Sequence, residues 1–198
     1  MRARDENKLQ NIKRKALETI VEHGFDGLSM QKLAKAAGVS PGTIYIYFKD
    51  RNDLIMQVCH DANHRMSEAT LKNFNPDSHF DEGLRVQWMN RAKYCIENPL
   101  DMHFMEQIRF SPMYEEAHKT MDRKFIEAMK TFVHNAIRRN ELVKLPVEVY
   151  WSIAFAPLYQ LLKYHMSGKG MPGNEKFILH QSIMSQTLQL VLKALKPA

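Results

Sequence analysis

Apolar side chains recur every three or four residues along almost the whole chain, and this spacing constrains the fold most. A period of 3.6 residues places such side chains on one face of an α-helix. The eight glycines and eight prolines among 198 residues are few, and they fall where helices would end. Hydrophobic residues at 44% and charged residues at 25% are typical of a soluble globular protein. We therefore expect an all-α protein of about nine helices.

Short helices with clear start and stop signals are predicted at the beginning of the chain. The first covers residues 8–23 and ends at Gly24. The second begins after Ser29, a good N-cap, and stops at Gly38. Ser40 then caps a third short helix. Two helices joined by a short turn that contains glycine are typical of a helix-turn-helix.

The third predicted helix carries more large side chains than one buried face needs. Ile44 and Phe48 are four residues apart and supply the buried face. At 100° per residue, the other side and its flanks carry Gly42, Thr43, Tyr45, Ile46 and Tyr47. Either this side contacts something outside the protein, or Tyr45 and Ile46 pack under the first helix or under the long fourth helix that follows.

A helix of this kind can place its N-terminal end in the major groove of DNA. Main-chain N–H groups and the Ser40 hydroxyl can then reach phosphate oxygens. Tyrosine hydroxyls can also bind phosphates, and Ile46 can lie against a thymine methyl group. The outer side of the third helix is therefore predicted to be a recognition face.

Residues from about Leu9 to Val58 resemble the tetracycline-repressor (TetR) family of bacterial transcription regulators. The resemblance is carried by the segment "ALETIVEHGFDGLSMQKLAKAAGVSPGTIYIYFKDRNDLI", with its Gly24-Phe25 corner, Ser29, and the run from Ala37 to Ser40. It implies a DNA-binding domain over residues 1–54, with a three-helix helix-turn-helix. It also implies a helical ligand-binding and dimerisation domain over residues 55–198.

The resemblance also implies roles for single residues by their position in the motif. Phosphate contacts are implied for Ser29, Ser40, Tyr47 and Lys49, and base or phosphate contacts for Thr43 and Tyr45. The predicted DNA-binding set is completed by Pro41, Gly42 and Ile46. Many relatives have a second aromatic residue at the position of Ile46 and a histidine at that of Tyr47, so the operator sequence of a relative does not transfer to this chain.

Basic residues near the N-terminus form a second candidate contact with DNA. The chain has a formal net charge of +6, which permits an anionic partner. Six early basic residues are Arg2, Arg4, Lys8, Lys13, Arg14 and Lys15. They are either a solvated face or a set of phosphate contacts.

The rest of the chain is predicted to form longer helices. After a polar break at residues 73–79, the predicted spans are 81–97, 100–109, 113–140, 146–166 and 175–195. The last two carry more apolar surface than one intramolecular face requires, which predicts pairing with a second copy of the chain. The alternative is a strongly apolar monomer core. The resemblance favours the homodimer, because family members dimerise through their last helices.

Methionine and aromatic residues are frequent in this second part, and such side chains fill adaptable apolar cavities as well as ordinary cores. The resemblance implies a ligand cavity in this region. The predicted apolar lining is Trp88, Phe104, Ile108, Phe125, Met129, Phe155 and Tyr159. His103 and Glu106 are the predicted polar anchors.

Enzyme motifs are absent from the sequence. It contains no Gly-x-Ser-x-Gly, no phosphate-binding glycine loop and no His-Glu-x-x-His, so we expect neither catalysis nor a cofactor. One alternative is a metal site at His60 and His64, beside Cys59. The N-terminal ten residues have no apolar core, and no apolar run approaches the roughly 20 residues of a membrane span, so we expect a cytoplasmic protein without a membrane partner.

These observations predict a homodimeric repressor that binds a pseudo-palindromic operator in double-stranded DNA. A small apolar or amphipathic effector, not identified by the sequence, would shift the fourth helix and release the DNA. The alternatives are a transcriptional activator and a ligand-independent architectural DNA-binding protein.

Overall fold

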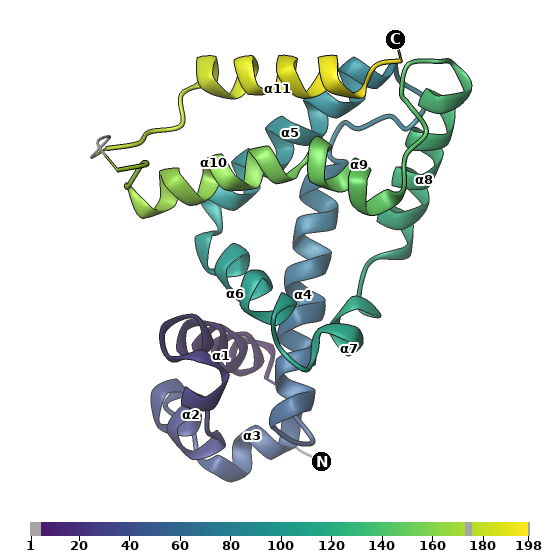
Figure 1. Ribbon diagram of the computed structural model, residues 1–198. Helices are drawn as coiled ribbons and strands as arrows, with labels where there is room; N and C mark the ends of the chain where they lie inside the picture. The colour runs from purple at the N-terminus through teal and green to yellow at the C-terminus, as the bar shows by residue number, and fades with distance from the viewer. Residues whose placement is uncertain (1–4, 173–175, 198) are drawn as a thin grey trace. The chain divides into compact units, whose positions relative to one another are not determined.

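The computed structural model describes residues 5–172 and 176–197 (Figure 1). These residues form eleven helices and no strand, which confirms the predicted all-α class. The helices pack into two units, each built from two separate stretches of sequence. Unit 1 contains residues 1–65 and 98–121, and unit 2 contains residues 66–97 and 122–198. Within the described part of the chain, no helix combines the length and the apolar character that a membrane crossing requires.

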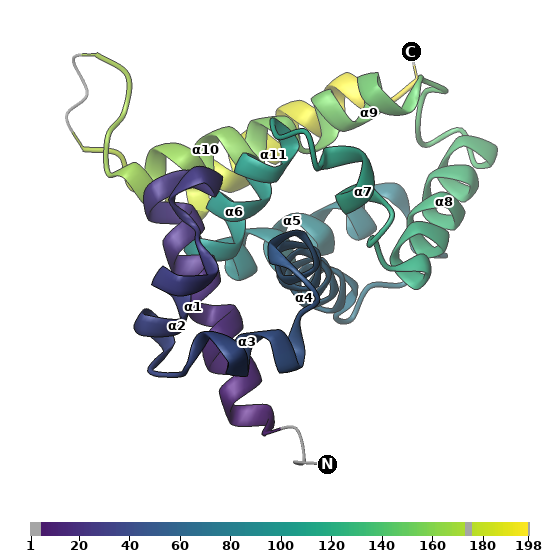
Figure 2. The same cartoon turned by 90° about the horizontal axis from the view of Figure 1, so that it is seen from below.

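Unit 1 is organised around its first helix. Its helices are α1 (Glu6–Gly27), α2 (Met30–Ala37), α3 (Pro41–Tyr47), the N-terminal part of α4 (Arg51–Leu71), α6 (Pro99–Arg109) and α7 (Tyr114–His118). α1 packs against α2 and α6, and α3 leads into the start of α4 (Figure 2). The buried stripe of α1 consists of Ile12, Ala16, Leu17 and Ile20. It joins buried residues of α2, α3, α4, α6 and α7 in one apolar cluster.

The regular turns of α1 end at a kink at Gly24, where the sequence predicts the end of the helix. Gly24 has φ 70° and ψ 178°, a conformation that side chains rarely allow, and the chain forms one more turn as far as Gly27. The N–H of Leu28 then donates to the carbonyl of Phe25 at 3.1 Å. This turn brings Leu28 into the core, where it is 3% exposed.

Helix α4 is continuous from Arg51 to Leu71, so no break occurs at the predicted domain boundary between residues 54 and 55. The residues that α4 buries in the same cluster as α1, α2 and α3 are Leu54, Ile55, Val58, Cys59 and Ala62. The α6 and α7 segments also pack in unit 1. The compact units have different bounds from the predicted domains, because packing rather than sequence order determines the units. The predicted division into a DNA-binding domain and a ligand-binding domain remains a prediction.

Unit 2 contains the end of α4 together with α5 (Phe80–Glu97), α8 (Arg123–Arg138), α9 (Val147–Ala154), α10 (Ala156–Ser167) and α11 (Gln181–Leu195). α11 runs beside α9 and α10, while α5 packs against α8 and α10 (Figure 1). The most deeply buried apolar residues of this unit include Phe80, Leu84, Trp88, Phe132, Ala154, Phe155, Leu158 and Leu162. The indole Nε1 of Trp88 donates to the carbonyl of Ala154 at 2.8 Å, which ties α5 to the end of α9.

Two long predicted helices are each divided in the structure. The span 113–140 is divided into α7 and α8, because Asp122 caps α8 by accepting the N–H of Lys124 at 2.7 Å. The span 146–166 is divided into α9 and α10 at Phe155 (φ −127°, ψ −29°). Pro157 has no N–H to donate to the preceding turn, which explains the break. The last helix starts at Gln181, and its predicted start at residue 175 lies outside the described residues.

Gly83 marks the crossing of α5 and α8. A Cβ atom at this position would lie 2.3 Å from Cε2 of Phe132, whose side chain is fully buried. Phe132 also packs on Phe80, with ring centroids 5.6 Å apart. The close approach of the two helices therefore depends on the missing side chain of Gly83.

We predict that Gly83→Ala lowers the free energy of unfolding by about 1–3 kcal/mol, because the buried Phe132 ring must move. Urea unfolding followed by circular dichroism measures this. The control is Gly42→Ala in α3, where the nearest atom to a new Cβ is 3.9 Å away, and its stability should be unchanged or higher. A Gly83→Ala protein as stable as the unmodified chain would contradict this account of the crossing.

Candidate DNA-binding surface

The turn between α2 and α3 is fixed by local hydrogen bonds. The Ser29 side chain accepts the N–H of Lys32 at 3.2 Å and so caps α2. Gly38 ends that helix in the left-handed conformation, with φ 68° and ψ 33°. The N–H of Val39 donates to the carbonyl of Ala34 at 3.0 Å, as in a glycine-terminated helix. The Ser40 side chain accepts the N–H of Thr43 at 3.2 Å, so α3 begins directly after the turn. This is the helix-turn-helix that the sequence predicts.

The first turn of α3 keeps its polar groups near the surface. Pro41 occupies the first turn, where its missing N–H breaks no hydrogen bond, and both Pro41 and Gly42 are exposed. The Ser40 and Thr43 hydroxyl oxygens lie 2.9 Å apart, and either can donate to the other. A hydroxyl group can therefore face an external acceptor without any change in the helix.

Helix α3 has a buried side and an exposed side. Ile44 is 0% exposed and Phe48 is 1% exposed, whereas Tyr45 is 56% and Ile46 is 53% exposed. Tyr45 and Ile46 therefore do not pack under α1 or α4, and that alternative is excluded.

Tyr47 differs from its predicted place on the flank of the exposed side. It is 9% exposed, and its hydroxyl accepts the N–H of Asp5 at 3.0 Å. The same hydroxyl donates to the Asp5 carbonyl at 3.3 Å. Tyr47 therefore attaches the end of α3 to the start of α1. The predicted phosphate contact of Tyr47 remains a prediction.

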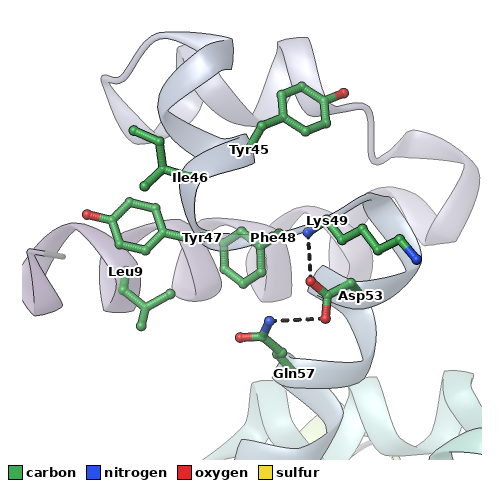
Figure 3. Close-up of a pocket in the computed structure, with 8 residues that line it drawn as sticks. All are labelled: Leu9, Tyr45, Ile46, Tyr47, Phe48, Lys49, Asp53 and Gln57. Atoms are coloured by element: carbon green, nitrogen blue, oxygen red, sulfur yellow. Dashed lines mark hydrogen bonds between the residues drawn. The ribbon is translucent and has the colours of Figure 1, made fainter. Parts of the chain in front are cut away.

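A hollow of ≈ 380 Å³ lies beside the exposed side of α3 (Figure 3). Its lining comes from α1, α3, the loop to α4 and the first turns of α4, and consists of Leu9, Tyr45, Ile46, Tyr47, Phe48, Lys49, Asp53 and Gln57. The Asp53 carboxylate accepts the main-chain N–H of Lys49 at 2.8 Å and the Gln57 side-chain amide at 3.1 Å. These hydrogen bonds hold the main chain at Lys49 in place. The Lys49 side chain is exposed and extends away from Tyr47 in Figure 3.

The basic run of α1 is largely paired with carboxylates of the same unit. Lys13 binds Asp61 at 2.8 Å, and Arg14 and Lys15 each approach Glu18 at 2.7 Å. The hydrogen bond from Lys15 is the main cause that lowers the pKa of the Glu18 carboxyl. Lys8 lies 3.2 Å from Asp5, and Arg2 and Arg4 fall outside the described residues. The paired residues favour a solvated, internally neutralised face over a set of phosphate contacts.

The predicted ligand-binding residues are divided between the two units. Phe104 and Ile108 belong to the apolar cluster of unit 1, beside an exposed His103 and a half-buried Glu106. The remaining residues all lie in unit 2: Trp88, Phe125, Met129, Phe155 and Tyr159. Phe104 and Ile108 lie in unit 1 because their helix, α6, packs against α1. The predicted single lining remains a prediction.

Sequence reasoning missed the most unusual polar residue of unit 2. Arg91 in α5 is 2% exposed, and its guanidinium carbon lies 4.5 Å from the centre of the Phe155 ring. Its Nη1 donates to the Tyr159 hydroxyl at 2.9 Å. One signal could have revealed it: Arg91 follows Trp88 by three residues, on the apolar stripe of a predicted helix.

The alternative metal site at His60, His64 and Cys59 is not assembled. The Cys59 thiol is fully buried, lies 3.7 Å from the Asn63 amide nitrogen and 3.8 Å from the Thr120 hydroxyl, and burial raises its pKa. Both histidine side chains are exposed, with ring centroids 6.4 Å apart. The thiol therefore faces the core and the histidines face solvent.

We predict that Tyr47→Phe lowers the free energy of unfolding by about 0.5–1.5 kcal/mol, because it removes the hydroxyl that binds the Asp5 main chain. Tyr45→Phe is the matched control, since its exposed hydroxyl should contribute little. Urea unfolding of the variants gives the difference. Equal midpoints for Tyr47→Phe and the unmodified chain would show that the hydroxyl does not anchor α1.

Comparison with known proteins agrees with this geometry. Residues 12–58 match the model of the bacterial regulatory proteins of the tetR family. An uncharacterized HTH-type transcriptional regulator of Haemophilus influenzae is 31% identical over 136 residues, which cover 68% of this chain and 71% of the relative. The HTH-type transcriptional repressor AcnR of Corynebacterium glutamicum is 23% identical over 149 residues, covering 72% and 73% of the two chains.

Solved structures show the same fold. The crystal structure of a TetR-family transcriptional regulator from Haemophilus influenzae superposes with a TM-score of 0.80 at 23% identity, covering 99% of this chain and 100% of the other. The family is one of transcriptional regulators and not of enzymes. From its helix-turn-helix, its relatives and its fold, this chain belongs to the tetR family of bacterial regulatory proteins.

Proposed function

We propose that this protein is a homodimeric repressor that binds a pseudo-palindromic DNA operator and releases it when a small molecule binds. It would act in the cytoplasm, where a bacterial operator is accessible. The observation that supports DNA binding is the exposed side of α3, where Tyr45 and Ile46 are more than half exposed and the neighbouring Ile44 is fully buried. The relative named as a repressor supports repression rather than activation.

The proposed base contacts follow from the side chains on the exposed side of α3. Ile46 offers an exposed apolar surface, which suits a thymine methyl group in the major groove. Tyr45 and Thr43 offer hydroxyls to bases or phosphates, and Ser29, Ser40 and Lys49 are proposed to bind phosphates. Pro41 and Gly42 leave the start of α3 without bulky side chains, which allows close approach of the DNA backbone.

Dimerisation is supported by a second apolar stripe on α11. The buried stripe of this helix consists of Met184, Leu188, Val191, Leu192 and Leu195. A neighbouring stripe contains Ile183, Thr187 and Leu190, and Leu190 is 64% exposed. A second copy of the chain would cover these side chains and place two α3 helices about one DNA turn apart.

The proposed response to a ligand passes through α4. This helix is continuous from Arg51 to Leu71 and contributes residues to both units. A ligand that shifts the unit 2 end of α4 would move the start of the helix, which follows α3 directly. A preference of about 2–3 kcal/mol for the shifted state would weaken DNA binding roughly 30- to 150-fold.

We predict that Tyr45→Ala abolishes sequence-specific DNA binding and leaves stability within about 0.5 kcal/mol, because the side chain is exposed. The measurement is selection from random duplex DNA at ~150 mM salt, followed by binding to the enriched sequence. Tyr114→Ala is the matched control, since Tyr114 is an exposed tyrosine of unit 1 that lies in α7 and not in α3. An enriched palindrome that Tyr45→Ala still binds at full affinity would contradict the proposed recognition face.

We also predict that Leu190→Glu converts the dimer to a monomer, because a charge in an apolar interface is left unpaired. Gln189→Glu is the control, as Gln189 is exposed on the neighbouring side of α11. Sedimentation equilibrium gives the mass of each variant. A dimer that persists in Leu190→Glu would place the interface elsewhere.

A further inference from the structure

Unit 2 buries the positive charge of Arg91, which forms no ion pair with any residue that the structure describes. Arg91 is 2% exposed, and three aromatic rings surround its guanidinium carbon. The ring centres of Phe155, Trp151 and Phe125 lie 4.5, 5.3 and 5.5 Å from it. Such rings attract a cation by their faces, but they supply no negative charge and accept no in-plane hydrogen bond.

One edge of the Arg91 guanidinium has no partner. Nη1 donates to Tyr159, whereas Nε and Nη2 are buried and have no hydrogen-bond acceptor among the described residues. Burial is the main cause that raises the pKa of Tyr159 and also that of Tyr150, so both hydroxyls stay neutral at physiological pH. Leaving charged donors buried without an acceptor is unfavourable, and native structures seldom do so.

The chain itself shows what this edge binds when a partner is available. Arg65 uses the same pair of atoms to hold the Asp101 carboxylate, with Nε 2.9 Å from Oδ2 and Nη2 2.8 Å from Oδ1. This is the two-point contact that a planar guanidinium makes with a planar carboxylate. The Nε and Nη2 edge of Arg91 therefore has the shape and charge that a carboxylate requires.

Further polar groups of unit 2 are also left without partners. Gln87, one helical turn before Arg91 on the same face of α5, is 0% exposed, and both its amide nitrogen and its amide oxygen lack a partner among the described residues. The hydroxyl of the buried Thr70 in α4 is in the same condition. Buried polar groups of α4 and α5 without hydrogen-bond partners therefore occur in the same unit as Arg91.

We propose that Arg91 is the anchor of a binding site for a small carboxylic acid with an apolar body. The carboxylate accepts hydrogen bonds from Nε and Nη2 of Arg91, and the apolar body packs among the aromatic side chains of α8 and α9 and of Phe155, which follows α9. A single negative charge matches the single charge of Arg91. A phosphate monoester would bring a second negative charge into this apolar environment, which is costly to desolvate.

This proposal names the chemical class of the effector and in that respect rests on the proposed function. Carboxylate binding does not depend on the proposed function, because a carboxylate can bind in unit 2 whether or not DNA is released. The two claims are therefore tested by separate measurements.

The binding test uses octanoate and 4-phenylbutyrate as probes, with 1-octanol and 4-phenyl-1-butanol as neutral counterparts of the same shape. Trp88 and Trp151 are the only two tryptophans of the chain, and the Trp151 ring centre lies 5.3 Å from the Arg91 guanidinium carbon. Tryptophan emission therefore reports on this site directly. We expect saturable changes with the carboxylates, and binding about 10- to 100-fold weaker for the alcohols.

Arg91→Met removes the charge at similar volume, and Arg91→Lys keeps the charge but loses the two-point contact. Both should weaken carboxylate binding about tenfold or more. Arg85→Met is the matched control on the exposed side of α5 and should bind normally. Carboxylates should also raise the melting temperature of the unmodified protein but not that of Arg91→Met. Arg91→Met without ligand should melt no lower than the unmodified protein, because an unpaired buried charge has been removed.

Equal carboxylate binding by Arg91→Met and the unmodified protein would overturn the proposal, as would the absence of binding by both probes. Operator binding is then measured at saturating carboxylate. If the probes bind through Arg91 and operator affinity does not change, the carboxylate site stands and the ligand-responsive part of the proposed function fails.

Discussion

The burial of Ile44 and Phe48 is the constraint on which the DNA-binding unit depends. Helix α3 has seven residues, too few to be stable without tertiary packing. Ile44 lies in the helix and Phe48 directly follows it, four residues on, and both enter a cluster shared with α1, α2 and α4. Once this side is fixed in the core, the rotation of the helix is fixed as well. Tyr45 and Ile46 must then face outward, and the exposed side of α3 follows from the packing of the opposite one.

The hydrogen bonds around α3 make that arrangement rigid at both ends. Ser40 fixes the first turn, and the Tyr47 hydroxyl attaches the last residue of the helix to Asp5. Beyond it, Asp53 holds the main chain of Lys49. A surface that is ordered before it meets DNA loses less conformational entropy on binding. The short helix is therefore a preorganised element, although its own length could not stabilise it.

The parts of this fold that sequence predicts well are those with local causes. The caps at Ser29 and Ser40 and the left-handed Gly38 act within five residues, so the helix-turn-helix was predictable. Tyr47 was misplaced because its partner, Asp5, is 42 residues away. The sequence did not predict that the candidate ligand-binding residues are divided between the two units. Periodicity shows which stripe of a helix is apolar, but not which other helix covers that stripe. For the same reason the sequence cannot distinguish Arg65, which meets Asp101, from Arg91, which meets aromatic rings.

The central claim is that the outer side of α3 reads DNA, and its two isoleucines offer a direct test within one helix. Ile46 is 53% exposed and Ile44 is 0% exposed. Methyl NMR spectra of isoleucine-labelled protein, recorded with a duplex selected by the protein, compare the two side chains in one sample. The account predicts a large shift of the Ile46 methyl signal and little change for Ile44 and for Ile178, which is exposed in unit 2. An unchanged Ile46 signal at saturating duplex would contradict it.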